Sequence, residues 1–277
     1  MTQPQAVTFV VQRCSEDAAG EQEYRVPIRP GMTVLDGLLL IQKTLDATLA
    51  WRFSCRMGIC GSCAMVMNGR PGLACNTQIS NVDDAVIRLA PLPNFRVIKD
   101  LAVDLHPMLE KHRALKPFIL SDPAAAENET PAGDDGCEYV QSPEELLEFL
   151  QFSDCIKCGA CMAVCPTVAL DPQFPGPMPL AALHRYNADT RDAGFGQRRE
   201  ALKEFHDPGH CHYAAECSQV CPKGVDPARA IQLLKRSLVV DSFGLRRAGG
   251  EPDRLPAGKA DAAKKIPAPD YTVDSGG

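Results

Sequence analysis

The residues best suited to chemistry in this chain are its cysteines, thirteen among 277 residues. Most of them gather in three stretches: CRMGICGSC from Cys55 with Cys75 further on, CIKCGACMAVCP from Cys155, and CHYAAECSQVCP from Cys211. Thiols so closely spaced can form disulfides or hold metal. Disulfide scaffolds are typical of short secreted chains, and the opening residues MTQPQAVTFVVQRC show neither a secretory nor a transit signal. We therefore expect thiolates that hold metal or carry out redox chemistry.

The second and third stretches form a pair. The second has the C-x2-C-x2-C-x3-C-P spacing of ferredoxins with two clusters, in which the fourth cysteine serves the other cluster. On the same template, the third stretch has Ala214 where its second cysteine would stand. A [4Fe-4S] cluster would then be held by Cys155, Cys158, Cys161 and Cys221. The remaining site has three thiolates, from Cys165, Cys211 and Cys217, which most simply hold a [3Fe-4S] cluster.

The first stretch has a different spacing. Cys55, Cys60 and Cys63 follow the C-x4-C-x2-C pattern of plant-type ferredoxins, and Cys75 is the distant fourth ligand expected for a [2Fe-2S] cluster. Glycines within the loop allow the backbone to curl around sulfur. Zinc is the alternative for any C-x2-C pair, but three cysteines this close together, separated by glycines, favour the cluster.

The first stretch follows the elements of a small sheet domain. Strands are predicted at 7–13 and 24–28, then a helix from Val34 whose cap is Thr33 with Asp36, a hairpin beginning at 64–67, and a strand at 86–90. This order predicts a β-grasp domain over residues 1–120, which ends in a helix over 97–111.

Residues 121–136 are acidic and rich in Ala, Pro and Gly, which predicts an exposed linker. A second, all-helical domain is then predicted over 137–248. Its first helix is capped at Ser142, and Leu146, Leu147 and Leu150 would form the inner face of that helix. Further helices are predicted over 180–190 and 197–205 and from Asp226 onward, and residues 249–277 are expected to be disordered. The predicted fold class is α+β.

Composition and missing motifs limit the possible functions. Lys+Arg number 29 against 35 Asp+Glu and the pI is near 5.6, which argues against a nucleic-acid partner. No stretch of eighteen uncharged apolar residues is present to span a bilayer. No nucleotide fingerprint, phosphate loop or nucleophile with a paired base is visible. A hydride acceptor such as flavin would therefore belong to another polypeptide, and this chain would supply a row of one-electron sites.

Taken together, these motifs resemble the iron-sulfur subunit of succinate dehydrogenase or fumarate reductase, the respiratory complex II family, over about residues 6–240. The resemblance implies a flavoprotein subunit with FAD that interconverts succinate and fumarate, a link between the tricarboxylic acid cycle and the respiratory chain. It implies that electrons pass through [2Fe-2S], [4Fe-4S] and [3Fe-4S] clusters to a quinone. One or two membrane anchor subunits would hold the chain, as a peripheral subunit, at the cytoplasmic face of the bacterial inner membrane.

The resemblance also places Thr167 and His212 near the quinone. It fits less well at Leu170, where the family often has a tryptophan that contacts the quinone. Cys14 and Cys137 fall outside the pattern and are expected to bind no cluster. Two alternatives are an iron-sulfur subunit of a thiol-driven fumarate reductase or a glycolate-type dehydrogenase, and a zinc-stabilised interaction module without a redox role.

Overall fold

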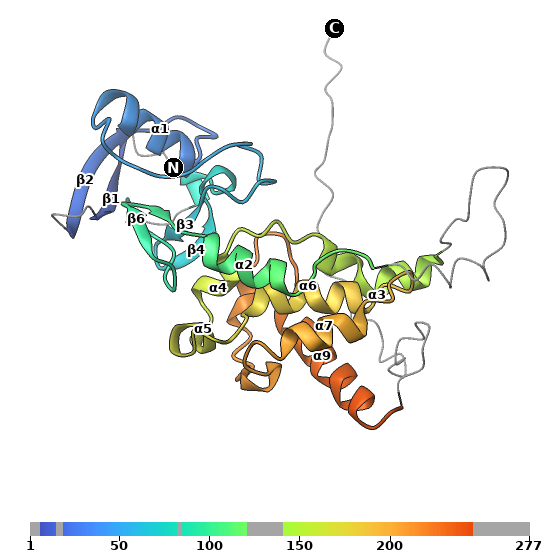
Figure 1. The fold of residues 1–277 in the computed structure, drawn as a ribbon. Coiled ribbons are helices and arrows are strands. Elements are labelled where there is room, and N and C mark those ends of the chain that lie inside the picture. The colour runs from blue at the N-terminus through green and yellow to red at the C-terminus, as the bar shows by residue number, and fades with distance from the viewer. Residues whose placement is uncertain (1–5, 15–18, 82–84, 121–140, 246–277) are drawn as a thin grey trace, which may run out of the picture.

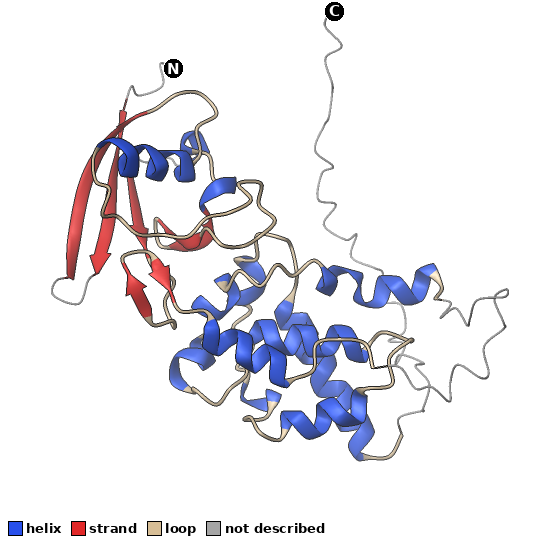
Figure 2. Ribbon diagram, turned by 45° about the horizontal axis from the view of Figure 1, so that its top comes forward, coloured by secondary structure: helices blue, strands red, loops and turns tan. Residues whose placement is uncertain are grey.

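The computed structural model describes residues 6–14, 19–81, 85–120 and 141–245. A sheet with one helix across it forms one end of the molecule, and packed helices form the other (Figure 1). Figure 2 shows the same division, with the strands gathered at one end. Residues 141–245 contain helices and no strand, so the predicted α+β fold class is confirmed. The expected linker 121–136, the expected tail 249–277 and Cys137 lie outside the described residues.

The sheet has five strands in the order β2-β1-β5-β3-β4. The strand bounds are β1 Ala6–Cys14, β2 Ala19–Pro27, β3 Ala64–Met67, β4 Arg70–Leu73 and β5 Val86–Ala90. β1 pairs with β2 in antiparallel orientation and with β5 in parallel orientation. β5 in turn pairs with β3 in antiparallel orientation. Asn68 and Gly69 have φ of +46° and +82°, as a two-residue hairpin turn requires, so the predicted hairpin is confirmed.

Helix α1 (Val34–Thr44) lies across the sheet and begins at the predicted cap. The Thr33 hydroxyl accepts a hydrogen bond from the backbone N–H of Asp36, whose carboxylate accepts one from the N–H of Thr33. Gly37 faces the ring of Phe9, where a side chain would have no room. Two 3₁₀ turns, η1 (Ala74–Asn76) and η2 (Ile79–Asn81), follow the hairpin. The β-grasp order of elements is thus present.

The helix predicted over 97–111 is wrong in its first half. The chain instead forms a short hairpin of β6 (Val97–Lys99) and β7 (Ala102–Val103), and only then helix α2 (His106–Ala114). Asp100 turns the hairpin at φ +47°. Its carboxylate accepts hydrogen bonds from the Arg13 side chain at 2.9 Å and from the backbone N–H groups of Cys14 and Ala50 at 3.1 and 2.9 Å. These distant partners override the local helical pattern.

The second part of the molecule is built from helices. Their bounds are α3 Pro143–Ser153, α4 Ala160–Ala163, α5 Pro166–Leu170, α6 Pro177–Asn187, α7 Phe195–Leu202, α8 Glu216–Gln219 and α9 Pro227–Ser242, with a 3₁₀ turn η4 at Pro208–His210. The predicted cap at Ser142 is present, where Ser142 and Glu145 form a capping box at α3. Helix α9 begins where the sequence predicted it, and there the Asp226 side chain accepts from the N–H of Arg229. The starts of α3 and α9 could therefore be located from the sequence.

The inner face predicted for α3 is wrong. Leu146, Leu147 and Leu150 are 39%, 68% and 42% exposed, whereas Phe149 and Phe152 are 1% and 3% exposed. The two phenylalanines pack in a cluster with Ala181 of α6 and Ala230 of α9. Because aromatic side chains bury more apolar area than leucine, the helix turns its phenylalanines inward.

Helix α2 packs on the helical part, although the sequence placed it in the first domain. It contacts α6, and the ammonium group of Lys111 donates hydrogen bonds to the carbonyl oxygens of Pro172 and Phe174 at 2.7 and 2.8 Å. Leu115, just after the helix, belongs to a buried cluster with Phe174. The segment that leaves the sheet is thereby fixed to the helices.

A buried ion pair holds the residues after α2. The side chains of Arg198 and Asp192 are 0% and 1% exposed and form two hydrogen bonds of 2.6 Å. The same guanidinium donates to the carbonyl oxygens of Lys116 and Phe118 at 3.0 and 2.6 Å. Residues 116–118 are therefore attached to α7, where Arg198 lies.

Candidate metal centres

The first cysteine loop curls around the sulfur of Cys55. The backbone N–H groups of Ile59 and Cys60 point at this sulfur from 3.4 and 3.2 Å. Gly58 and Gly61 have φ of +70° and +74°, a region that side chains disfavour. The prediction that glycines allow the loop to curl is confirmed, and the resulting cage of N–H groups suits sulfur that carries negative charge.

The four thiols of this first group differ in environment. Hydrogen bonds from Ser62 and from the backbone lower the pKa of Cys60 to about 6. Burial raises the pKa of Cys63 to about 12, and the neighbouring sulfur of Cys75 adds to this shift. The exposed side of the group thus favours thiolate, while the buried side needs positive charge from a bound metal to lose its proton.

A second group of thiols lines one hollow of about 390 Å³ in the helical part. Its cysteines are Cys155, Cys158, Cys161 and Cys221, and Met178 and Val225 close the wall. Three of these cysteines come from the second stretch of the sequence, and the fourth comes from the third stretch. The structure therefore brings together the four cysteines that the crossed pattern assigned to one site.

A third group lines a neighbouring hollow of about 360 Å³. It contains Cys165, Cys211 and Cys217, and Ala214 lies in its wall. This is the other half of the crossed arrangement, with three thiols and an alanine where a fourth ligand would stand. Tyr213 and Ala215, on either side of Ala214, have φ of +57° and +60°, so the backbone bends sharply at this position.

The buried thiols are suited to a cationic metal core. Burial raises the pKa of the thiols at Cys155, Cys158, Cys161, Cys165 and Cys217. Within each group, the charges of neighbouring cysteines raise these pKa values further. Several thiolates cannot share a buried space without compensating positive charge. Iron supplies that charge, so the donor set fits iron-sulfur clusters.

The three groups lie next to one another. A Cβ added to Gly61 of the first loop would lie 2.9 Å from Cβ and 3.0 Å from Cα of Cys158, and 3.1 Å from the carbonyl oxygen of Ile156. The backbones of the first and second groups are thus in contact. The second and third groups share one continuous stretch through α4, and the charge of Cys217 acts on the thiol of Cys161. The second group therefore lies between the other two.

Asn94 is a positioning residue that the sequence did not reveal. It lies before β6, and its side-chain amide donates to the carbonyl oxygens of Met162, Ala163 and Cys165 at 2.9, 3.0 and 3.2 Å. These carbonyls end α4, so a residue of the sheet part caps the turn that carries a thiol of the third group. Asn94 has a left-handed φ of +65°, a conformation that asparagine tolerates. The carbonyl groups that Asn94 binds lie 68 to 71 residues away in the sequence, so no local sequence pattern indicates its role.

Thr167 and His212 both line the third hollow. Thr167 is 5% exposed, and its hydroxyl donates to the carbonyl oxygen of His210 at 3.4 Å, while His212 is exposed. Leu170, which stands at the family's tryptophan position, is 82% exposed at the end of α5. Cys14 ends β1, outside the three groups.

A group of potential ligands outside the cysteines is formed by Asp171, His206 and His210. Sequence reasoning did not find it because its members lie up to 39 residues apart and match no spaced motif. Among the described residues, no helix is both long enough and apolar enough to cross a bilayer.

Known proteins resemble both parts of the chain. One family model, described as a 2Fe-2S iron-sulfur cluster binding domain, matches residues 8–110, and another, described as a 4Fe-4S dicluster domain, matches residues 151–225. The fumarate reductase iron-sulfur subunit of Mycobacterium tuberculosis is 46% identical over 220 residues, 79% of this chain and 86% of that protein. The mitochondrial succinate dehydrogenase [ubiquinone] iron-sulfur subunit of Candida glabrata is 34% identical over 244 residues, 86% of this chain and 93% of that protein.

The fold agrees with these relatives. A chain of the Mycobacterium smegmatis Sdh1 complex in the apo form superimposes with a TM-score of 0.70 at 29% identity, over 86% of this chain and 96% of that chain. The chain therefore belongs to the family of succinate dehydrogenase and fumarate reductase iron-sulfur subunits, oxidoreductase components that carry [2Fe-2S], [4Fe-4S] and [3Fe-4S] clusters.

Proposed function

We propose that this chain relays single electrons between an FAD-bearing flavoprotein subunit and a quinone site in one or two membrane anchor subunits. The complex would interconvert succinate and fumarate, and the chain would sit as a peripheral subunit at the cytoplasmic face of a bacterial inner membrane. The observation that carries the proposal is the continuous row of three thiol groups, with backbone contact between Gly61 and Cys158.

The ligands follow from the grouping of the thiols. The [2Fe-2S] cluster would be held by Cys55, Cys60, Cys63 and Cys75, the [4Fe-4S] cluster by Cys155, Cys158, Cys161 and Cys221, and the [3Fe-4S] cluster by Cys165, Cys211 and Cys217. When bound, each cluster accepts and releases one electron at a potential set by cluster type, charge, hydrogen bonds and burial. The chain sets these conditions: it points N–H groups at the sulfur of Cys55 and offers only three thiolates at the last site.

The two ends of the row are suited to different partners. Met57 and Ile59 in the first loop are 72% and 54% exposed, and at the other end Leu170 and Tyr213 are 82% and 57% exposed. Partner subunits would cover these exposed apolar side chains at the two ends of the row. We assign the first end to the flavoprotein and the second to the membrane anchor.

Two polar residues belong to the anchor end. Thr167 and His212 line the hollow of the three thiols, and we propose that they lie near the quinone. A histidine can exchange protons near neutral pH, and a quinone needs protons as well as electrons when it is reduced. The exposed position of His212 leaves it accessible to solvent protons.

Metal analysis of the anaerobically purified full chain tests the proposal against a zinc-stabilised module. If the three cluster types are present, the chain should contain roughly nine iron atoms. After treatment with a chelator it should contain no zinc. A colourless chain with zinc bound at the thiolates would refute the proposal.

The three-thiolate site allows a sharper test. In the Ala214→Cys variant a fourth thiolate enters the third hollow, where a fourth iron can then bind. We expect redox-titrated EPR to show the oxidised three-iron signal replaced by a cluster of lower potential. Ala215→Cys is the matched control, because the neighbouring residue lines the same hollow but occupies no ligand position of the pattern. An unchanged three-iron signal in Ala214→Cys would contradict the ligand assignment.

A further inference from the structure

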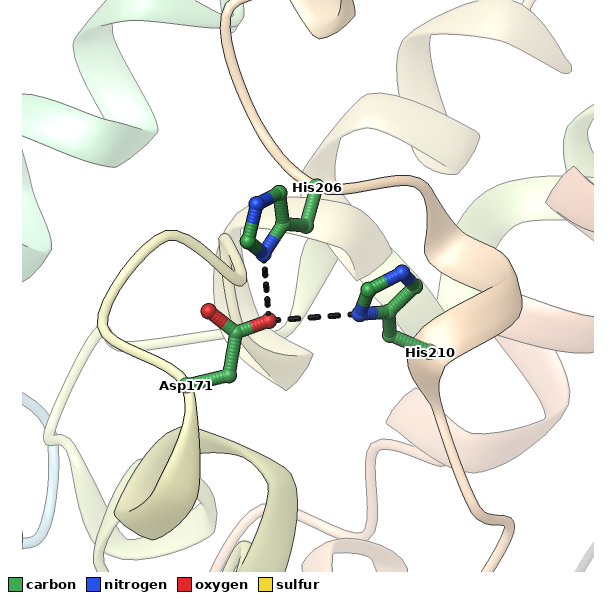
Figure 3. Close-up of side chains that lie close together, drawn as sticks. All are labelled: Asp171, His206 and His210. Carbon is green, nitrogen blue, oxygen red and sulfur yellow. Dashed lines mark hydrogen bonds and ion pairs between the residues drawn. The ribbon is translucent and has the colours of Figure 1, made fainter.

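Outside the row of cysteines, three side chains meet at one point on the surface of the helical part (Figure 3). The Nδ1 atoms of His206 and His210 lie 2.8 and 3.3 Å from the same oxygen, Oδ2 of Asp171. All three donor atoms lie within 4.8 Å of one another. Two imidazoles and one carboxylate form a donor set that proteins use for transition metals.

The local backbone holds the carboxylate in place. Asp171 follows α5, and its second oxygen, Oδ1, accepts the backbone N–H of Gln173 at 2.9 Å. The carbonyl oxygen of Gln173 in turn accepts the N–H of His206 at 3.2 Å. Oδ1 therefore fixes the turn, while Oδ2 is directed at the two histidines.

The second histidine is fixed by a different element. His210 ends the 3₁₀ turn η4, which is capped by the side chain of Asp207. The rings of His206 and His210 have centroids 5.0 Å apart and an angle of 34° between their planes, so both Nδ1 atoms approach Oδ2 from neighbouring directions. The arrangement is set by the loops that follow α5 and α7, which lie far apart in the sequence.

The spacing agrees with tetrahedral zinc. Bonds of about 2.0–2.1 Å to nitrogen and oxygen place neighbouring donors about 3.3–3.4 Å apart. The observed separations of 2.8 and 3.3 Å need only small rotations of the side chains to reach this geometry. The histidine side chains are 51% and 52% exposed and that of Asp171 is 17% exposed, so an ion can enter from solvent and keep a water as its fourth ligand.

An ordinary hydrogen-bonded ion pair is the simpler explanation of such a cluster. It accounts for the observed distances, because one carboxylate oxygen can accept hydrogen bonds from the Nδ1–H groups of two imidazoles. A metal ion would replace those two protons and use the same three donor atoms, so zinc uptake distinguishes the two explanations. The nearby cation Lys111 donates to the carbonyl oxygens of Pro172 and Phe174 and so does not occupy Oδ2. Oδ2 of Asp171 therefore faces only the two histidine rings among these neighbouring side chains.

We infer that Asp171, His206 and His210 bind one divalent transition-metal ion, with zinc the best match. The site adjoins the three-thiolate hollow, because Cys211 follows His210 and the Thr167 hydroxyl bonds to the carbonyl oxygen of His210. A bound ion would tie the loop after α5 to the loop that carries Cys211. The inference does not depend on which metal the thiols hold.

Zinc uptake by the full chain with its iron in place tests this site. Chelator-treated protein is titrated with ZnCl2, and bound zinc and iron are measured together by mass spectrometry. The variants are Asp171→Asn, which keeps an Oδ1 acceptor for the turn, and His206→Gln, because His206, unlike His210, does not directly precede a cysteine in the sequence. The matched control is His106→Gln, because His106 is 75% exposed and lies 3.9 Å from a single carboxylate, that of Glu110.

We expect one zinc ion per chain in the wild type and in the control. Each of the two variants should bind zinc at least about tenfold more weakly, since even residues that only orient a metal ligand are worth tenfold or more in affinity. Their iron content should stay at the wild-type value, which shows that the helical part is folded. The inference would be overturned if the wild type took up no more zinc than the two variants. It would also be overturned if zinc bound to the wild type only as iron was lost. Loss of iron from the wild type before zinc is added would count against the proposed electron relay instead.

Discussion

The contact between the first two thiol groups can be tested at Gly61, where a single methyl group should be costly. In Gly61→Ala the new Cβ would lie 2.9 Å from Cβ of Cys158, and the other close atoms, Cα of Cys158 and the carbonyl oxygen of Ile156, belong to the backbone. Carbon atoms pack best about 3.5–4.0 Å apart. The two loops would therefore have to separate by roughly 0.6 Å or more.

The magnitude has two parts. Alanine at φ +74° costs about 1–2 kcal/mol, because a side chain disfavours the left-handed region. Overpacking against backbone adds about 1–3 kcal/mol. Gly69→Ala isolates the first part, since Gly69 has φ +82° and no atom within 4 Å of an added Cβ.

The assay compares denaturant midpoints of the two variants with that of the wild type, under anaerobic conditions and with clusters in place. Gly61→Ala should be less stable than Gly69→Ala by about 1–3 kcal/mol. It should also weaken the magnetic coupling between the reduced first and second clusters in EPR, because the clusters move apart. Equal loss of stability in both variants, with unchanged coupling, would refute the close contact.

Three further perturbations concern polar side chains that the structure holds by specific contacts or by burial. Asn94→Ala removes the donor to three carbonyls at the end of α4. It should lower the free energy of unfolding by about 1–3 kcal/mol. Asn94→Gly keeps the left-handed backbone accessible, so it should lose a similar amount of stability if the amide group is responsible. Arg198→Met leaves buried Asp192 without its counter-charge and should cost about 3–5 kcal/mol, much of which the double variant Arg198→Met/Asp192→Leu should restore. Burial lowers the pKa of His184 to about 4, whereas the pKa of an unfolded histidine is near 6.5. Between these two pH values the unfolded chain binds more protons than the folded chain. The free energy of unfolding should therefore fall by roughly 2 kcal/mol from pH 7 to pH 5. Burial lowers the pKa of His112 to about 4 as well. His184→Leu cannot titrate at this position and should therefore reduce, but not abolish, this part of the pH dependence of thermal unfolding, whereas an unchanged profile would show that other groups cause it.

Sequence reasoning succeeded where a structural feature depends on residues close together in the chain. The capping boxes that begin at Thr33 and Ser142 use side chains three residues apart. The turn at Asn68 and Gly69 depends on the left-handed backbone of two adjacent residues. The β-grasp and helical parts followed from these signals and from the spacing of the cysteines. Local chemistry therefore gave the fold class and grouped the thiols.

It failed where distant partners decide the outcome. The expected helix begins late, at His106, because Asp100 turns a hairpin in which Arg13 and Ala50 donate hydrogen bonds to its carboxylate. Neither partner is near Asp100 in the sequence. The inner face of α3 depends on which residues α6 and α9 present, so the period of the leucines pointed to the wrong side. The meeting of Asp171 with two histidines is likewise a product of the folded loops.

The contacts between the two parts of the molecule bear directly on the proposed function, because an electron relay needs fixed separations between its sites. The core of the sheet part contains Cys63 and Cys75 together with Cys158, Ala160 and Ala163 from the helical part. Cysteines of both parts are thus packed in one hydrophobic core, which transmits strain and resists change of shape. The spacing of the first two thiol groups is therefore set by side-chain packing within that core, so core substitutions there should alter electron transfer as well as stability.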